Sequence, residues 1–598
     1  MSSLDLAVVG NCAIASLISK TGRHVWFCFP RLDGEPVFSA LVAGTDPDRG
    51  FSDVVLKGAA SWTQHYAGNT PILETLGTDD VGAQVKITDF APRHEKFGRS
   101  FHPPMLVRRI EPLTGRPRIS VRMRPVFDYG ATAPTLTVGS NHITYSALSA
   151  PSLRVTTDMP LSYLADETEF VLDRPLHLFV GPDEPVPESP DRLATTFLSE
   201  TELYWRSWAR GLSIPFEWQE EVIRSAIALK LCNYEDTGAI VAALTTSIPE
   251  APHTVRNWDY RFCWLRDAYF AVGALNRLGA TRTMEGFIRF VLDAVLGAGP
   301  HTSIPPLFPI SGRGDLVERI ATALPGYQGM GPVRVGNAAG TQVQHDVYGS
   351  IILTAAQMFF DRRLSNSGDI ALYEQLRPVG EFAVRCAFEP DAGPWEYRGR
   401  ALPHTYSAAM CWAGAHRMGM IADKLGLPAD AHEWRERAAR IQSELLTRAT
   451  TREGWISGAL DAEVADASTL LLTEIGLLTA TDPRVTKTLE IVERRLMRDG
   501  FVFRYNEADD FGSPETAFLV CTFWYCDALG LAGRKDEARR LFENAIACRN
   551  SVGLLSEDVD PTTRLLWGNF PQAYSHVGLI HTAWRLSRGW EEALWRAS

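Results

Sequence analysis

The chain has 598 residues, of which 45% are hydrophobic and 22% are charged. This is the composition of a globular protein, and the length exceeds that of one ordinary hydrophobic core, so we expect two or more domains. The formal net charge of -12 argues against a nucleic-acid partner, which needs a basic surface, and it disfavours binding to an anionic membrane.

The first residues, Met1 to Ile18, lack the basic start of a secretory signal peptide, and no apolar run is long enough to span a bilayer. The nine cysteines are odd in number and scattered, so we interpret them as reduced thiols and expect a cytoplasmic location. No Cys/His set has the spacing of a zinc site. We therefore expect no metal and no cofactor, and the oligomeric state stays open, a homo-oligomer included.

Residues 1–180 have the pattern of β structure. The segment Arg118-Ile119-Ser120-Val121-Arg122-Met123-Arg124 alternates strictly between polar and apolar residues, as a half-buried strand does. Weaker alternation occurs at Val85–Thr88 and at Leu176–Leu178. Because Gly and Pro interrupt these runs at short intervals, the pattern predicts an all-β sandwich domain over residues 1–180.

A linker is predicted next, over residues 181–213. Its first ten residues, GPDEPVPESP, hold four prolines and three acidic residues, a composition that joins neither kind of core. A helical stretch containing Tyr204, Trp205 and Trp208 is expected to follow within the same segment.

From residue 214 to residue 598 the apolar period becomes helical, which predicts an all-α domain. Three helical faces stand out: Trp218, Val222, Ala226 and Leu229; Met284, Phe287, Ile288, Val291 and Val295; and Trp434, Ala438, Ile441 and Leu445. The segments between the predicted helices are long and rich in Gly, Pro and aromatic residues. Long structureless loops inside a compact domain are usually functional, so we expect a site among them.

Aromatic and charged residues gather in these loops. Of the 16 tryptophans, 14 follow residue 200, and several adjoin acids or arginines, as in Trp264-Leu265-Arg266-Asp267 and Pro394-Trp395-Glu396. Sugars present apolar C–H faces and rings of hydroxyls, so a sugar site combines aromatic platforms with carboxylates and arginines. The structural alternative is that these tryptophans fill the helical core.

Hydrolysis of a glycosidic bond needs two carboxyl groups, one to protonate the leaving oxygen and one to activate water or to attack carbon. Glu396 lies between Trp395 and Tyr397, an aromatic setting that favours the protonated form of a carboxyl. Glu557 follows the apolar run Gly553-Leu554-Leu555. Taken alone, either residue is also compatible with an ordinary solvated or paired acid.

Several motifs, in order along the chain, resemble glycoside hydrolase family 15, which includes glucoamylases, glucodextranases and bacterial trehalases. They are Leu17-Ile18-Ser19 through Trp26 to Pro30-Arg31-Leu32-Asp33, Thr237–Ala243 with Thr245–Glu250, Asn257–Asp267, Pro332–Asn337, Trp395-Glu396, and Gly568–His576. The resemblance extends over nearly the whole chain.

This resemblance implies a β-sandwich followed by an (α/α)6 barrel and an inverting reaction that releases β-glucose from the non-reducing end of an α-glucoside. It implies Glu396 as the general acid and Glu557 as the general base. The substrate would contact Tyr260, Trp264, Arg266, Asp267, Trp395, Arg504 and Trp524. Arg266 and Asp267 would bind hydroxyls of the terminal glucose, which suits the donor fork of Arg and the acceptor oxygens of Asp; the structural alternative for this pair is a salt bridge.

The sequence departs from the bacterial members at Ser407-Ala408, at His416-Arg417, at Asp558 and at Pro325–Met330. These departures leave the substrate open among malto-oligosaccharides, isomalto-oligosaccharides and trehalose.

Two other functions are compatible with parts of the sequence. Asp558-Val559-Asp560-Pro561-Thr562 fits a phosphatase pattern that requires a doubly wound sheet and Mg²⁺. A non-catalytic sugar-binding protein on the same fold is the second alternative.

Overall fold

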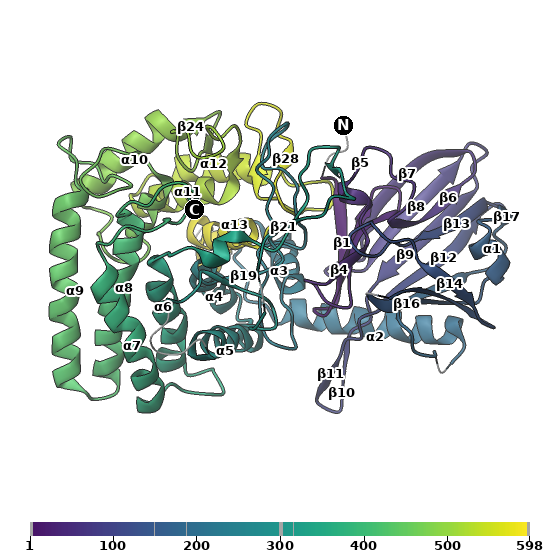
Figure 1. Ribbon diagram of the computed structural model, residues 1–598, viewed down its shortest axis with the longest axis horizontal. Helices are drawn as coiled ribbons and strands as arrows, with labels where there is room; N and C mark the ends of the chain where they lie inside the picture. Colours follow the sequence, from purple (N-terminus) through teal and green to yellow (C-terminus); the bar gives the residue numbers. More distant parts are fainter. Residues whose placement is uncertain (1–3, 149, 187, 298–302, 315, 595–598) are drawn as a thin grey trace.

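The structure is a computed structural model that describes residues 4–148, 150–186, 188–297, 303–314 and 316–594. Two bodies lie side by side along its long axis (Figure 1). The first, purple to blue, consists of strands, and the second, teal to yellow, consists of helices joined by long loops. None of the helices in the described part of the chain combines the length and the apolar composition of a bilayer span.

The strand-rich body is a sandwich of two antiparallel sheets. One sheet contains, in spatial order, β1 (Leu6–Gly10), β2 (Ala15–Ser19), β3 (His24–Phe29), β6 (Phe51–Leu56), β13 (Arg118–Arg124) and β17 (Phe170–Val171), with β4 (Glu35–Phe38) paired to β3. The other contains β14 (Thr135–Val138), β15 (His142–Ala147), β16 (Ala150–Thr157), β18 (Leu176–Pro182), β12 (Leu106–Thr114), β9 (Gln84–Phe90), β8 (Leu73–Asp79) and β7 (Ala59–Tyr66).

Alternation of side chains along the strands builds the core between the sheets. In β13, Ile119, Val121 and Met123 are buried while the residues between them face outward, which confirms the strand predicted at Arg118–Arg124. The same core takes Ile87 from β9 and Leu178 from β18, the two strands predicted more weakly.

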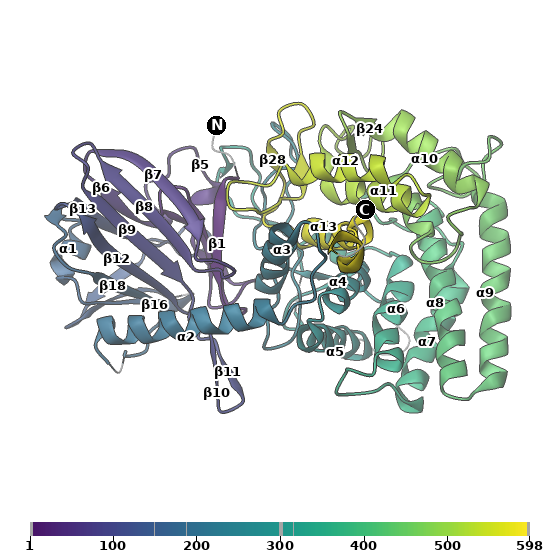
Figure 2. The same cartoon turned by 180° about the vertical axis from the view of Figure 1, so that it is seen from behind.

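Helix α2 (Pro190–Arg210) connects the two bodies and contains the predicted Tyr204, Trp205 and Trp208. It packs against β18 and runs along the lower edge of the molecule from the sandwich to the helices (Figure 2). A hairpin of β10 (His94–Lys96) and β11 (Arg99–Phe101) projects beside it, and α1 (Leu161–Ala165) packs against β13. The domain boundaries at residues 180 and 214 remain a prediction.

The helical body is a ring within a ring, as predicted for an (α/α)6 barrel. Each inner element packs against the next in the order α4 (Leu265–Arg277), α6 (Asp346–Phe360), α8 (Thr405–Lys424), η3 (Ala467–Leu472), α11 (Leu519–Leu531) and α13 (Ala573–Leu586), which returns to α4. The outer elements are α3 (Gln219–Leu231), α5 (Thr281–Gly297), α7 (Ile370–Cys386), α9 (Pro428–Ala449), α10 (Pro483–Leu496) and α12 (Lys535–Ile546).

Burial separates the two rings because an enclosed helix is apolar all round, whereas an outer helix has one apolar stripe. α11 is buried along almost its whole length. In α9 the buried residues include the predicted Trp434, Ala438, Ile441 and Leu445, and charged residues occupy the exposed side. The predicted face of α5 is likewise buried. Trp218 immediately precedes α3, with Val222, Ala226 and Leu229 buried within that helix.

The long loops that lead into α4, α6, α11 and α13 contain short strands. They contain β19 (Cys263–Trp264), β20 (Leu307–Phe308), β21 (Arg319–Ile320), β22 (Gly326–Tyr327), β23 (Arg334–Val335), η2 (Ala338–Thr341), β24 (Met497–Arg498), β25 (Phe501–Val502), β26 (Ala517–Phe518), β27 (Asp558–Val559) and β28 (Leu566–Trp567). β22 pairs with β5 (Ala43–Gly44), which follows η1 (Ala40–Val42), so the first body anchors the connection between α5 and α6. α14 (Trp590–Leu594) is the last described helix.

Candidate active site

A pocket with an empty volume of about 610 Å³ lies where the inner helices begin. Its wall includes Tyr260, Trp264, Arg266, Asp267, Trp395, Glu396, Arg504 and Trp524, which were all predicted from the sequence. The structure therefore brings together residues that lie as far apart in the chain as Tyr260 and Trp524. The remaining predicted residue, Glu557, lies behind Tyr260.

The turn from β19 into α4 supplies one side of the pocket. Trp264 is the N-cap residue of α4, and Arg266 and Asp267 follow in its first turn. The Arg266 guanidinium donates to Gln344 Oε1 at 2.9 Å and to Glu396 Oε1 at 3.1 Å, whereas its Nε lies 3.7 Å from Asp267. Burial raises the pKa of Asp267 to about 7, while the Arg266 guanidinium acts in the opposite direction.

Glu396 lies in the connection between α7 and α8, and 21% of its side chain is exposed. Its Oε1 accepts hydrogen bonds from Trp264 Nε1 at 2.6 Å, from Arg266 at 3.1 Å and from Gln344 Nε2 at 3.3 Å. The preceding Trp395 donates through Nε1 to Asp466 at 2.9 Å. Because the three donors found among the described residues all meet Oε1, Oε2 is the oxygen left for a proton or a substrate.

Glu557 directly precedes β27 and is almost fully buried. Its Oε1 accepts a hydrogen bond from the Tyr260 hydroxyl at 2.7 Å, while Oε2 has no hydrogen-bond partner among the described residues. Gly568 makes room for this side chain, since a Cβ at that position would lie 2.6 Å from the Glu557 Cβ. The Gly568–His576 motif therefore contributes space rather than a functional side chain at its first residue.

Two further carboxyl groups act on Glu557. Burial, followed by the charges of Asp558 and Glu250, raises the pKa of Glu557 well above its ordinary value, whereas Arg504 and the bond from Tyr260 lower it. Burial also raises the pKa of Asp558 to about 7, against the charge of Arg504. Arg504 forms an ion pair with Glu250 and lies 4.0 Å from Asp558. The guanidinium of Arg504 thus lies among three buried carboxyl groups, and Arg256 forms a second ion pair with one of them, Glu250, at 3.8 Å.

The two predicted catalytic carboxyl groups are connected through aromatic side chains. The rings of Tyr260 and Trp264 meet edge to face with their centroids 5.3 Å apart. Tyr260 binds Glu557 and Trp264 binds Glu396, so the series runs from one carboxyl to the other along the pocket wall. Chemically, this places a partly open carboxyl and a buried one beside a pocket lined by aromatic rings and an Arg-Asp pair.

Comparison with known proteins identifies the family. The profile of glycosyl hydrolases family 15 matches residues 218–584, and a profile described as the trehalase-like N-terminal domain matches residues 4–159. The chain belongs to glycosyl hydrolase family 15.

Curated relatives match the chain nearly end to end. A trehalase from Mycolicibacterium smegmatis is 31% identical over 98% of this chain and 92% of its own length. A trehalase from Thermoplasma volcanium is 31% identical over 98% of this chain and 93% of its own length. The fold matches the crystal structure of a bacterial glucoamylase complexed with acarbose, with a TM-score of 0.71, 14% identity and coverage of 98% of this chain and 94% of that chain.

Membership of family 15 confirms that the chain is a glycoside hydrolase with the predicted fold. The phosphatase alternative is wrong. Its first Asp would lie at the end of a parallel strand, but Asp558 begins the short strand β27, which pairs antiparallel with β26 and β28 inside the helical body. The non-catalytic alternative also fails, since the family and the curated relatives are enzymes.

Sequence reasoning missed several residues of this family 15 pocket. The hydroxyls of Tyr406 and Tyr574 are buried at the pocket without a hydrogen-bond partner in the described part of the chain. Burial raises the pKa of both phenols well above the ordinary value, so they are neutral donors. Tyr574 lies inside the family 15 motif Gly568–His576, and Tyr406 directly precedes Ser407. The sequence therefore marked the segment around each tyrosine but not the tyrosine itself.

Gln344 and Ser407 also contribute to the site, although the sequence assigned neither of them a role. Gln344 touches both Arg266 and Glu396, yet a glutamine before a helix has no pattern of its own. Ser407, the first residue of the Ser407-Ala408 pair, is buried and donates to Asp391 at 2.7 Å. Asp391 in turn accepts from the backbone N–H of Gly393, so Ser407 supports the loop of Glu396 from behind.

Proposed function

We propose that this protein hydrolyses trehalose with inversion, using Glu396 as general acid and Glu557 as general base. The observation that carries the proposal is the series Glu557–Tyr260–Trp264–Glu396 along the pocket wall, which gives the two carboxyl groups different surroundings beside one pocket. The choice of trehalose follows the relatives named trehalase, which match 98% of this chain.

The proposed acid step uses Oε2 of Glu396. Trp264, Arg266 and Gln344 hold Oε1, which orients the carboxyl group and leaves Oε2 to give its proton to the glycosidic oxygen as the bond to the anomeric carbon breaks. The leaving glucose departs as a neutral alcohol.

In the proposed base step, Glu557 accepts a proton from the water that attacks the anomeric carbon from the opposite face. The base has to be ionised. Burial and the charges of Asp558 and Glu250 raise the pKa of Glu557 and so oppose its ionised form. The hydrogen bond from Tyr260 and the charge of Arg504 favour the ionised form of Glu557.

The glucose that is attacked would lie between the aromatic wall and the Arg266-Asp267 turn. Trp395 and Trp524 supply apolar faces for the C–H side of the sugar. Asp267 offers acceptor oxygens. The hydroxyls of Tyr406 and Tyr574 and the Nε of Arg504 have no hydrogen-bond partner among the described residues and offer donors. These unsatisfied groups are the features of the pocket that a sugar would complete.

We infer that the protein works in a reducing compartment, the cytoplasm. Eight of the nine cysteines are buried, the ninth is half-buried, and none forms a disulfide. Burial raises the pKa of thiols such as Cys28 and Cys232, to about 11 and about 12, which keeps them protonated and unreactive.

Proton NMR of the first turnovers tests this function. Trehalose joins two α-linked anomeric carbons, so inversion at one of them releases one β-glucose and one α-glucose, whereas retention releases only α-glucose. We expect equal amounts of both anomers before mutarotation. α-Glucose alone would refute inversion, and turnover of maltose or isomaltose without turnover of trehalose would refute the substrate.

A further inference from the structure

The backbone of Glu396 has an unusual conformation. Its φ is +62°, in the left-handed region that a residue other than glycine rarely adopts. Such a conformation persists only when the surrounding structure determines it. The position of the Glu396 carboxyl therefore depends on what holds the turn around it, from Trp395 to Gly399.

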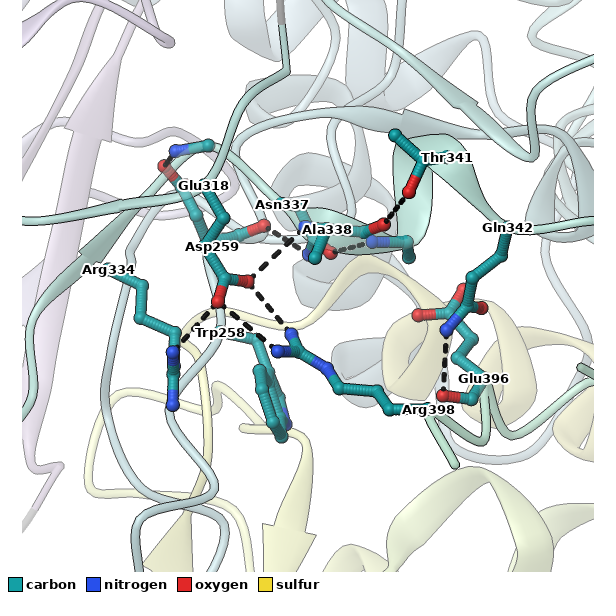
Figure 3. Close-up of polar contacts among 12 residues, drawn as sticks. Trp258, Asp259, Glu318, Arg334, Asn337, Ala338, Thr341, Gln342, Glu396 and Arg398 are labelled. Atoms are coloured by element: carbon teal, nitrogen blue, oxygen red, sulfur yellow. Dashed lines mark hydrogen bonds and ion pairs between the residues drawn. The ribbon is translucent and has the colours of Figure 1, made fainter. Parts of the chain in front are cut away.

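Two side chains from distant loops bind the backbone of this turn. Gln342 Nε2 donates to the carbonyl oxygen of Glu396 at 3.1 Å, a contact drawn in Figure 3, and lies 3.4 Å from that of Tyr397. Asp510 Oδ2 accepts from the N–H groups of Arg398 and Gly399 at 2.7 and 3.0 Å. The turn is thus held on its carbonyl side by one loop and on its N–H side by another.

Glu318 holds the same turn through a side chain. The guanidinium of Arg398, two residues after Glu396, donates to both oxygens of Glu318, at 3.2 and 2.8 Å. Glu318 also accepts from Arg334 at 2.8 Å and from the N–H of Ala338 at 3.2 Å. Figure 3 shows Arg398 and Arg334 reaching Glu318 from opposite sides.

The ion pair between Glu318 and Arg398 is shielded from water and restricted in position. Only 13% of the Glu318 side chain is exposed, so water screens the ion pairs weakly. Against the effect of burial, the bonds from Arg398 and Ala338 keep the pKa of Glu318 below its ordinary value. The Arg398 guanidinium also lies over the ring of Trp258, 4.4 Å from its centroid, which limits where it can move.

Glu318 is not among the residues that line the pocket, so a sugar in the pocket does not explain it. Its acceptor positions are instead directed to three segments of the chain: the turn of Glu396, the strand of Arg334 and the helix η2 at Ala338. Because β22 anchors the same connection to β5, Glu318 ties the turn of Glu396 to a loop that the β-sandwich supports.

We propose that Glu318 is a positioning residue for the general acid: through Arg398, and together with Gln342, it holds the turn so that the Glu396 carboxyl meets the glycosidic oxygen. This inference rests on the proposed function, because it needs Glu396 to be the proton donor. It implies that loss of Glu318 weakens proton donation while the pocket and the base remain in place.

The test compares two substrates in Glu318→Gln. Trehalose has a poor leaving group that needs a proton, whereas α-glucosyl fluoride has a leaving group that needs little. We expect kcat/KM for trehalose to fall about tenfold to a hundredfold, and kcat/KM for the fluoride to fall less than about threefold. Arg398→Met should give the same substrate dependence, and the double variant should lose no more than Glu318→Gln, because Glu318 reaches the turn of Glu396 through Arg398.

Glu217→Gln is the matched control. Glu217 also bridges two arginines, Arg539 and Arg588, but it does so beside α12, away from the pocket. We expect this variant to keep the wild-type ratio of the two kcat/KM values. An equal fall on both substrates in Glu318→Gln, or no fall on either, would overturn the positioning role while leaving the proposed function intact. A wild-type enzyme without activity on any α-glucoside would instead refute the proposed function.

Discussion

The two proposed catalytic carboxyl groups occupy opposite kinds of environment. Glu396 belongs to a turn with a left-handed backbone, keeps part of its side chain exposed and receives three hydrogen bonds on one oxygen. Glu557 directly precedes a strand, is almost fully buried and receives one hydrogen bond, beside the carboxyls of Asp558 and Glu250. Hydrogen bonds that orient the carboxyl group thus distinguish Glu396, whereas burial and, after it, the charges of neighbouring carboxyl groups distinguish Glu557.

This difference suggests how one site can assign two roles to the same type of residue. A proton donor has to meet the leaving oxygen at a defined angle, so its loop is held by surrounding contacts. A base has to be ionised in a buried place, so its charge depends on its neighbours. Substitutions near Glu396 should therefore change the dependence on the leaving group, and substitutions near Glu557 should change the dependence on pH.

The largest expected effect comes from the base. Glu557→Gln should lower kcat/KM for trehalose by about 10²–10⁴-fold, the usual contribution of a general base. Asp558→Asn, at the residue next to Glu557, is the matched control variant. It should remain active at neutral pH, and its acid limb should move to lower pH, because Asp558 raises the pKa of Glu557. Assays from acid to neutral pH measure both. Equal losses of kcat/KM in the two variants would contradict the assignment of Glu557, and not Asp558, as the base.

A smaller effect is expected on the side of Glu396. Arg266→Ala removes the donor that joins Gln344 to Glu396, and Asp267→Ala removes acceptors for sugar hydroxyls. Each change should cost about 2–4 kcal/mol of transition-state binding, measured as a fall in kcat/KM with the fold intact. Unchanged kinetics with a lowered melting temperature would make the pair structural.

The smallest effect concerns the link between the two carboxyls. Tyr260→Phe removes one hydrogen bond to Glu557, worth about 1 kcal/mol, or roughly a fivefold loss of kcat/KM at neutral pH. Because this bond lowers the pKa of Glu557, its loss should raise that pKa, and activity should then be lost at a higher pH as the solution is acidified. An acid limb at the wild-type position would show that the phenol does not act on the base.

The sequence predicted the features that depend on residues close together in the chain. Trp264, Arg266 and Asp267 lie within one turn, and their joint presence in a loop rich in aromatics already indicated a sugar site. The alternation in β13 and the apolar faces of α5 and α9 predicted the two bodies of the fold. Periodicity alone did not predict the barrel, which came from the resemblance to family 15.

The contacts that hold the site could not be predicted in this way. Glu318, Gln342 and Asp510 reach the turn of Glu396 from loops that are separated from it in the chain by long segments. Arg504 was expected at the site from the resemblance to family 15, but its ion pair with Glu250 near Glu557 was not. Glu318, Gln342, Asp510 and Glu250 are ordinary polar residues in the sequence, and only the closure of the barrel brings each to its partner.

The central claim is that Glu396 donates the proton and Glu557 activates the water. The most direct test measures kcat/KM of Glu396→Gln and Glu557→Gln on trehalose and on α-glucosyl fluoride. Glu396→Gln should lose activity on trehalose and keep most of it on the fluoride, since that leaving group needs little protonation, whereas Glu557→Gln should lose activity on both. Equal losses on both substrates in the two variants would contradict this division of roles.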